Sequence, residues 1–151
     1  TDEANATLGI VRLYTSGLCD EMLGRIQDDL FDLGADLCIP NNNFSTEGRA
    51  LRITQAQVDR LEAEIDQLNC DLPSLNSFVL PGGSKASAYL HLARTISRRA
   101  ERLMVALAES EHVNPLAIKF INRLSDHLFV LARHLNHANA QDILWRPGAN
   151  R

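Results

Sequence analysis

The sequence of 151 residues contains few cysteines and no long apolar run. Cys19, Cys38 and Cys70 are odd in number and far apart, and no C-x-x-C pair occurs, so the sequence supports neither a zinc knuckle nor a redox pair. We interpret these residues as buried or unreactive thiols in a reducing compartment. No stretch of about 18 apolar residues is present, so we expect no transmembrane helix. No signal-peptide pattern is found either.

Acidic residues outnumber basic ones, which gives a net charge of −4 and argues against a general nucleic-acid binder. From these features together we expect a protein that binds neither nucleic acids nor membranes, and we expect it in the cytoplasm. The length suits a single domain, residues 1–151, with a substantial core. The opening "TDEAN" lacks an initiator methionine and resembles the interior of a helix, so we expect that upstream residues are missing from this numbering.

Several common catalytic motifs are also missing. There is no G-x-x-x-x-G-K-[ST] loop and no G-x-G-x-x-G loop, and "GLCDE" is not a nucleophile elbow. A di-iron site needs two Glu-x-x-His pairs and two further glutamates, but only Glu109 and His112 fit, so we expect no such site. We interpret His134 and His137, which have no carboxylate partner in the pattern, as solvent or interface histidines.

Helical periodicity is the dominant pattern. One apolar stripe, which ends before Pro40, consists of Leu18, Met22, Ile26, Leu30, Leu33 and Leu37. Residues 41–49, "NNNFSTEGR", have the composition of a polar loop. Thr54 and Gln57 form a capping-box pattern, which precedes a heptad seam of Val58, Leu61, Ile65 and Leu68.

Two further helices follow the break "CDLPSLNSFVLPGGS". Ser84 suits the N-cap of a helix that runs to about His112, and another helix is expected from about Pro115 to Asn139. The second has the stripe Ala117, Ile121, Leu124, Leu128, Leu131 and Leu135. Short connections favour antiparallel neighbours, so the pattern predicts an all-α, up-and-down bundle of four long helices plus the fragment 1–16.

Four arginines are concentrated in "HLARTISRRAER", residues 91–102. Arg94, Arg98 and Arg102 recur every fourth residue, a spacing that costs about 0.2–0.5 kcal/mol per like-charged pair. A helical wheel assigns the core face to Tyr89, Leu92, Ala93, Ile96, Ala100, Leu103 and Leu107, and it groups Ser84, Ser87 and His91 with the arginines on the opposite side. The arginines are therefore expected to face away from the core.

Two interpretations of this arginine row remain open. It is either an ordinary solvated face or a binding site whose guanidinium groups donate bidentate hydrogen bonds to phosphate oxygens, here called a clamp. Acidic partners four residues away are almost absent, which favours the clamp. The preceding "PGGS" turn and the helix N-terminus also suit an anion.

Short polar residues also interrupt the apolar stretch "FINRLSDHLFVLAR". Asn122, Ser125 and Asp126 indicate either hydrogen bonds between helices or a binding site, and the two are compatible. For the first alternative, the candidate bond joins Asp126 to an arginine of residues 94–102. Near the start, Asp2 and Glu3 are either first-turn helix acids or partners for a cation elsewhere.

Five blocks carry a resemblance to a known family. In order, "DEAN", "FDLGADLCIP", "FVLPGGS", "LHLARTISRRAER" and "NRLSDHLFVLAR" resemble the PduO-type ATP:cob(I)alamin adenosyltransferases over nearly the whole chain. The resemblance implies a five-helix bundle, with its first helix truncated here, that assembles as a homotrimer with ATP and corrinoid at the subunit interfaces. It also implies transfer of the 5′-deoxyadenosyl group of ATP to the cobalt of reduced cobalamin, with release of triphosphate.

The resemblance also implies roles for individual residues. The ATP site corresponds to Arg98, Arg99, Glu101, Arg102 and Asn122. Asp2 is implied to pair with Arg94 across the interface, and both are assigned, with Arg98, to catalysis. The pattern alone would place Phe78 in the core. The resemblance instead implies that Phe78, Asp2 and Arg94 lie at the corrinoid, with Phe78 under the corrin ring. Mg²⁺ is expected on the ATP phosphates, and no protein metal ligand is assigned.

This chemistry fits the residues present. Cobalt(I) is itself the nucleophile, so the protein must position C5′ and stabilise the leaving triphosphate, for which arginines and Mg²⁺ suffice. An apolar Phe78 below the ring favours four-coordinate cobalt(II), which is easier to reduce. A cob(II)alamin reductase and a downstream B12-dependent enzyme are the expected partners.

The sequence departs from the family pattern in two places. A Gly- and Thr-containing N-terminal loop that wraps the triphosphate is absent, which indicates either an ordered fragment or compromised activity. An aromatic residue is common where His127 stands, and we expect this change only to adjust packing. The alternative function is a non-enzymatic helical interaction module whose arginine face docks an acidic partner.

Overall fold

Five helices form the body of the protein. The computed structural model describes residues 1–39, 50–139 and 142–151, and the predicted loop 41–49 lies outside the described residues. The helices are α1 (Asp2–Arg12), α2 (Gly17–Leu37), α3 (Gln55–Asn69), α4 (Lys85–Leu107) and α5 (Pro115–Asn139). Among the described residues there is no β-strand, only an isolated bridge between Val79 and Leu144. The predicted all-α class is confirmed.

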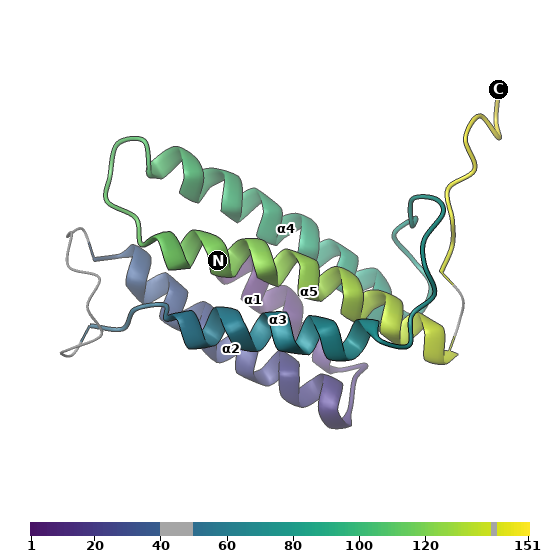
Figure 1. Cartoon of the computed structure of the whole chain (residues 1–151), viewed down its shortest axis with the longest axis horizontal. Helices are drawn as coiled ribbons and strands as arrows, with labels where there is room; N and C mark the ends of the chain where they lie inside the picture. The colour runs from purple at the N-terminus through teal and green to yellow at the C-terminus, as the bar shows by residue number, and fades with distance from the viewer. Residues whose placement is uncertain (40–49, 140–141) are drawn as a thin grey trace.

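The helices run side by side along the long axis of the molecule (Figure 1). The α4 and α5 helices form the most extensive pair, α3 packs on α5, and α1 packs on both α4 and α2. The predicted capping box at Thr54 and Gln57 and the predicted N-cap at Ser84 are both present. α4 ends at Leu107 rather than near His112, because the following amides turn back onto nearby carbonyls in tight turns.

The core is built from the predicted apolar stripes. On α2, Met22, Ile26, Leu30 and Leu33 are buried, and most of the predicted α3 and α5 stripe positions are buried as well. Leu37, Ile65 and Leu135 are partly buried, and Leu18 at the start of α2 is about half exposed. Burial of this many aliphatic side chains supplies the main free energy that holds the five helices together.

The predicted orientation of α4 is partly wrong. Leu92 and Leu103, assigned to the core face, are 49% and 66% exposed, whereas Ser87 and His91, grouped with the arginines, are buried. The reason is that α4 packs on α1 along one side and on α5 along another. The apolar residues of α4 therefore extend around the helix beyond the side that is buried. A helical wheel does not distinguish a core face from an exposed apolar surface.

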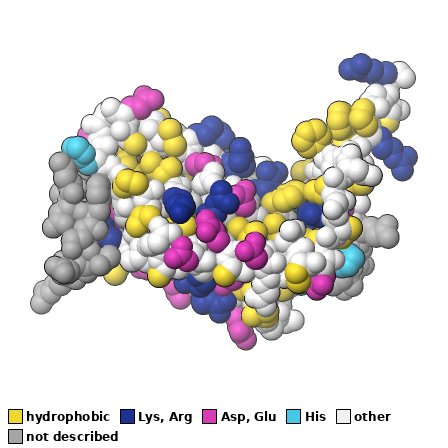
Figure 2. Space-filling model, in the orientation of Figure 1, with side chains coloured by type: hydrophobic (Ala, Val, Ile, Leu, Met, Phe, Trp, Pro, Cys, Tyr) yellow, Lys and Arg dark blue, Asp and Glu magenta, His cyan; other side chains and the backbone are white. Residues whose placement is uncertain are grey.

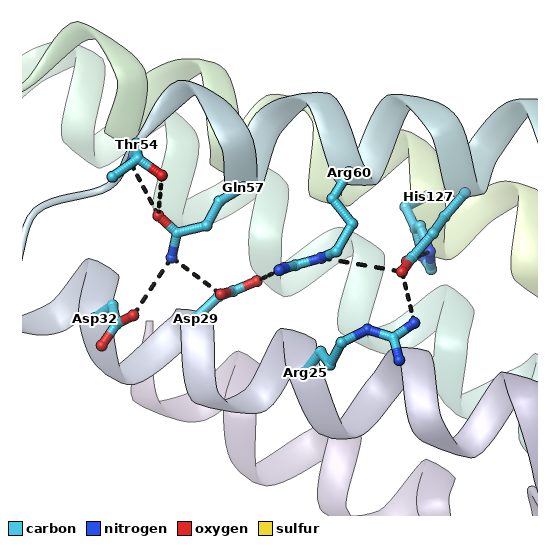
Figure 3. A network of polar contacts seen from close by, with 8 residues as sticks. Arg25, Asp29, Asp32, Thr54, Gln57, Arg60 and His127 are labelled. Atoms are coloured by element: carbon cyan, nitrogen blue, oxygen red, sulfur yellow. Dashed lines mark hydrogen bonds and ion pairs between the residues drawn. The ribbon is translucent and has the colours of Figure 1, made fainter.

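A chain of polar contacts crosses the interface of α2, α3 and α5 (Figure 3). Its centre is the buried carboxylate of Glu64, which lies 2.9 Å from His127 Nε2 and accepts a 2.8 Å hydrogen bond from Arg25. Further along, Asp29 pairs with Arg60 and accepts a hydrogen bond from Gln57. Such buried charges are tolerated because each is paired and hydrogen-bonded. His127 therefore joins α5 to α3 in addition to filling space.

We expect this contact chain to make stability sensitive to acid. Burial alone would raise the pKa of Glu64, but the hydrogen bonds from His127 and Arg25 outweigh burial and lower it. A lowered pKa stabilises the fold above the ordinary glutamate value of 4.5, and this contribution is lost as the pH falls through the folded-state pKa. The loss of unfolding free energy caused by Glu64→Gln should therefore shrink as the pH falls from neutral to below that value.

Urea unfolding at a series of pH values measures this difference directly. Comparison of variant with wild type isolates Glu64 from Asp29, whose pKa is raised by burial and acts on stability with the opposite sign. Asp66→Asn, at an exposed position on the same helix, is the matched control and should leave the pH profile unchanged. A Glu64→Gln effect of equal size at neutral and acid pH would contradict the prediction.

A second buried ion pair closes the end of α2. Arg52 donates to Asp36 at 2.6 Å, and both side chains are almost fully buried. The same carboxylate accepts hydrogen bonds from the Ile53 amide at 2.8 Å and from Asn114 at 2.7 Å. One carboxylate therefore ties together α2, the segment before α3 and the start of α5.

Candidate active site

A hollow of about 400 Å³ opens between α3, α4 and α5. It is lined by Ile65, Arg94, Arg98, Arg123, Ser125, Asp126, Phe129 and Val130. Arginines one turn apart on α4 face residues spaced by three on α5, so both helices direct one polar face into the same space. Figure 2 shows basic side chains gathered over α4 and α5, with acidic side chains close by.

Arg94 is the most constrained arginine of the hollow. Its guanidinium lies over the Phe129 ring at 6.0 Å, and its buried Nε atom has no hydrogen-bond partner among the described residues. Burial, together with the positive charge of Arg98, lowers the pKa of Arg94. A half-buried guanidinium without an anion is costly. Among the described residues, no carboxylate forms an ion pair with Arg94.

Arg98 and Arg102 extend the row toward solvent. Both are exposed, and Arg102 contacts the Arg98 carbonyl at 3.3 Å. Asp126 is paired at 3.3 Å with Arg123 of its own helix, so the proposed bond to an arginine of residues 94–102 is not formed. Asp126 nevertheless lines the same hollow as Arg98. The site thus combines several cationic groups with one carboxylate.

Asn122 and Glu101 are in direct contact. The Asn122 amide donates to Glu101 at 2.7 Å and joins α5 to α4. The Asn122 carbonyl oxygen accepts a 3.0 Å hydrogen bond from Arg123. Both ends of the Asn122 side chain are therefore held by hydrogen bonds, and one of the two partners, Arg123, lines the hollow.

Arg99 lies on another side of α4. It forms an ion pair with Glu3 of α1 and lines an apolar groove of about 290 Å³ with Thr1, Leu103 and further residues. The four neighbouring arginines are thus divided between two surfaces. Asp2 is exposed at the start of α1, and Arg94 and Asp2 form no ion pair with each other in the single chain.

Phe78 is not a core residue. It is 77% exposed on the loop before α4, and its ring lies 5.8 Å from that of Trp145. The Trp145 amide donates to the Phe78 carbonyl at 2.8 Å, and the Leu80 amide donates to the Ile143 carbonyl at 2.7 Å. Sequence reasoning missed Trp145, although its being the sole tryptophan was an available signal.

The "PGGS" turn does not offer all its amides to an anion. The Ser84 amide donates to Asn136 Oδ1 at 3.0 Å, and the Ser87 amide donates to Ser84 Oγ at 3.1 Å. The Ser84 and Ser87 amides are therefore satisfied inside the protein, and the predicted anion site at this turn stays a prediction. On α4, Arg94 and Arg98 are the cations that line the hollow.

A family model described as cobalamin adenosyltransferase matches residues 1–135. This chain belongs to the cobalamin adenosyltransferase family. Among curated relatives of this adenosyltransferase, the corrinoid adenosyltransferase of Mycobacterium leprae is 48% identical and covers 97% of this chain and 79% of its own length. That of Bacillus subtilis is 43% identical and covers 89% and 70%.

Solved structures agree with this assignment of the adenosyltransferase. A variant PduO-type ATP:corrinoid adenosyltransferase from Lactobacillus reuteri, complexed with cobalamin and ATP, superimposes with a TM-score of 0.87 at 36% identity. The match covers 97% of this chain and 80% of that chain. A second variant, complexed with ATP, gives a TM-score of 0.85 at 35% identity, covering 96% and 82%.

The described residues of this adenosyltransferase form no protein cage for a metal ion. No group of three or more His, Cys, Asp or Glu side chains is placed to hold one among them. Asp126 is the carboxylate that lines the hollow. One carboxylate combined with substrate phosphates is a donor set that Mg²⁺ accepts.

In the described part of the chain no helix is long and apolar enough to cross a membrane.

Proposed function

We propose that this protein transfers the 5′-deoxyadenosyl group of ATP to the cobalt of cob(I)alamin. The observation that carries the proposal is the arginine-lined hollow, where Arg94 lacks an anion, in a chain of the cobalamin adenosyltransferase family. The cobalt(I) electron pair attacks C5′ and a Co–C bond forms. The C5′–O bond breaks, and its electron pair leaves with triphosphate.

The arginines hold the leaving group. Arg98 is the exposed cation of the hollow, and its fork suits bidentate contact with phosphate oxygens. Fixed cations aimed at the departing triphosphate stabilise the charge that develops in the transition state. Arg102 extends this surface, and the Glu101–Asn122 contact orients the adjacent part of the nucleotide site. Arg99 contributes from the α1 side, where it must exchange its contact with Glu3.

Bound Mg²⁺ would neutralise part of the phosphate charge and polarise the triphosphate as a leaving group. In this chain, Asp126 would help to hold the ion, together with the phosphates of ATP. Phe78 would face the lower side of the cobalt and exclude a fifth ligand, for which its exposed apolar ring is suited.

The site is completed by a homotrimer. Leu92 and Leu103 form an exposed apolar surface on α4, which is a surface suited to contact with another subunit. The missing anion of Arg94 would then be Asp2 of the partner subunit.

The proposed reaction consumes cob(I)alamin, so a one-electron reductase of cob(II)alamin must supply it and a B12-dependent enzyme must use the product. We place this protein in the cytoplasm.

For Asp2→Asn we expect weaker corrinoid binding, because a neutral amide leaves the desolvated Arg94 guanidinium without its anion. The KM for cobalamin should rise roughly thirtyfold or more, since truncating one partner of a desolvated charge pair costs about 2 kcal/mol at least and about 1.4 kcal/mol corresponds to a tenfold change. Steady-state kinetics at saturating ATP measures this effect. Asp28→Asn, at an exposed position of α2, is the matched control. An unchanged KM in Asp2→Asn would count against the pairing.

The activity itself is tested with full-length protein, ATP, Mg²⁺ and chemically reduced cobalamin. Formation of the Co–C bond changes the corrin absorbance, and triphosphate should appear in equal amounts. Omission of ATP is the control. Absence of both signals, with a folded trimer and bound ATP, would contradict the enzyme and favour an interaction module whose arginine surface docks an acidic partner.

A further inference from the structure

Three polar residues at the end of α5 and just beyond it bind the loop that carries Phe78. We call Arg133, Asn136 and Asp142 the loop clamp. Arg133 is almost fully buried, and it donates to the Pro73 carbonyl at 2.7 Å and to Asp142 at 2.9 Å. The start of the loop is therefore tied to α5 through one guanidinium.

Asn136 binds the other end of the same loop. Its side chain is fully buried, donates to the Gly82 carbonyl at 3.1 Å and accepts the Ser84 amide at 3.0 Å. Gly83 between them has φ +98°, and a Cβ atom there would lie 2.3 Å from Asn136 Oδ1. The side chain and the backbone thus approach so closely that only glycine fits.

The middle of the loop is held by the segment after the clamp. Ser77 Oγ donates to the Trp145 carbonyl at 2.8 Å, and the Phe78 and Trp145 backbones are also hydrogen-bonded. Asp142, three residues before Trp145, contacts both Arg133 and Asn136. The loop is consequently fixed at its start, its middle and its end, although the Phe78 ring itself is exposed.

We propose that Arg133 and Asn136 are positioning residues that set the place of Phe78, and that they thereby set the fraction of bound cob(II)alamin that is four-coordinate. The inference rests on the proposed function in one respect, that Phe78 faces the lower side of the cobalt. An exposed ring cannot hold its own position, and a group that excludes a ligand must be supported within about half an ångström. Burial of an arginine and an asparagine beneath a surface loop provides that support.

The geometric part is tested in the absence of corrinoid. Trp145 is the only tryptophan and lies against Phe78, so its fluorescence reports whether the loop is docked. Asn136→Ala should shift Trp145 emission and increase its quenching by iodide. Gly83→Ala should have the same effect, because the added Cβ atom would clash with the unchanged Asn136 side chain and displace the loop. Leu23→Ala in the α2 core is the stability-matched control and should keep the wild-type spectrum.

The functional part is tested with cob(II)alamin and ATP. Electron paramagnetic resonance gives the four-coordinate fraction, which should fall roughly tenfold in Asn136→Ala and Gly83→Ala, in the direction of Phe78→Ala. Turnover should fall more from cob(II)alamin with a reductant than from chemically reduced cob(I)alamin, since only the first route needs the four-coordinate species. A general loss of stability would affect both routes alike, as Leu23→Ala will show.

The outcomes test the role of Phe78 at the cobalt separately from the positioning role of Arg133 and Asn136. If Phe78→Ala keeps the four-coordinate fraction, the role of Phe78 and the inference are both wrong, while the transferase activity stands. If Phe78→Ala loses that fraction but Asn136→Ala and Gly83→Ala keep both it and the Trp145 spectrum, the positioning inference alone is wrong. If Asn136→Ala does not fold, Gly83→Ala decides. Changes in fluorescence and in coordination in both Asn136→Ala and Gly83→Ala, absent from Leu23→Ala, support the positioning inference.

Discussion

Arg98→Ala is expected to lower turnover at least about thirtyfold while the helical bundle stays intact. Removing one charge from a desolvated phosphate clamp costs about 2–5 kcal/mol, and about 1.4 kcal/mol corresponds to a tenfold change in rate. The fold should survive because Arg98 is exposed and contributes no buried contact in the free chain. Initial rates with cob(I)alamin and ATP near its KM measure the loss, and far-ultraviolet circular dichroism checks the fold.

Two further variants define what Arg98 supplies. Arg98→Lys keeps the charge but loses the planar fork, so it should recover only part of the rate. Lys119→Ala removes an exposed cation of α5 that does not line the hollow, and it should behave like wild type. Wild-type rates in Arg98→Ala would overturn its role, and full recovery by lysine would reduce that role to charge alone.

Asp36→Ala is expected to destabilise the protein by about 3–5 kcal/mol, because one partner of a buried ion pair is removed. The change takes the carboxylate away from Arg52 and leaves the Ile53 amide without its acceptor. At about 2–4 °C per kcal/mol for a chain of this length, Tm should fall by roughly 10 °C. Differential scanning calorimetry measures the shift.

The matched control is Asp28→Ala, which removes an exposed carboxylate from the same helix and should change the free energy of unfolding by less than about 0.5 kcal/mol. Asp36→Asn keeps the shape and an acceptor oxygen, so it should fall between the two. Equal Tm values for Asp36→Ala and Asp28→Ala would show that the buried pair adds no stability.

The helices were predictable because their apolar residues repeat with the period of a helix. The stripe through Met22, Ile26 and Leu30 was expected to face the core, and all three residues are buried. α4 was harder, because Leu92 and Leu103 have the same chemistry as core residues but are exposed. Periodicity reports which residues share a face, and it does not report what covers that face.

The polar interior could not be predicted in the same way. Glu64 and His127 are 63 positions apart, and Asn136 and Gly82 are 54 apart, so no local pattern connects them. Arg94 and Arg98 were accessible from the sequence because the feature that marks them is local: a basic row with almost no acidic neighbours. The residues that complete their hollow, such as Arg123 and Phe129, required the packing of α5 on α4.

Charge compensation differs between the two sides of the bundle. Across α2, α3 and α5, the cations Arg25 and Arg60 are matched by carboxylates within hydrogen-bond distance, whereas Arg98 has no such neighbour in the part of the chain that the structure describes. With a net charge of −4, the protein as a whole repels a polyanion at long range. If ATP binds where we propose, it is therefore attracted only within about 8 Å of the α4 surface at physiological ionic strength. Its capture rate should fall as salt is added, with little change in the release of a ligand already seated.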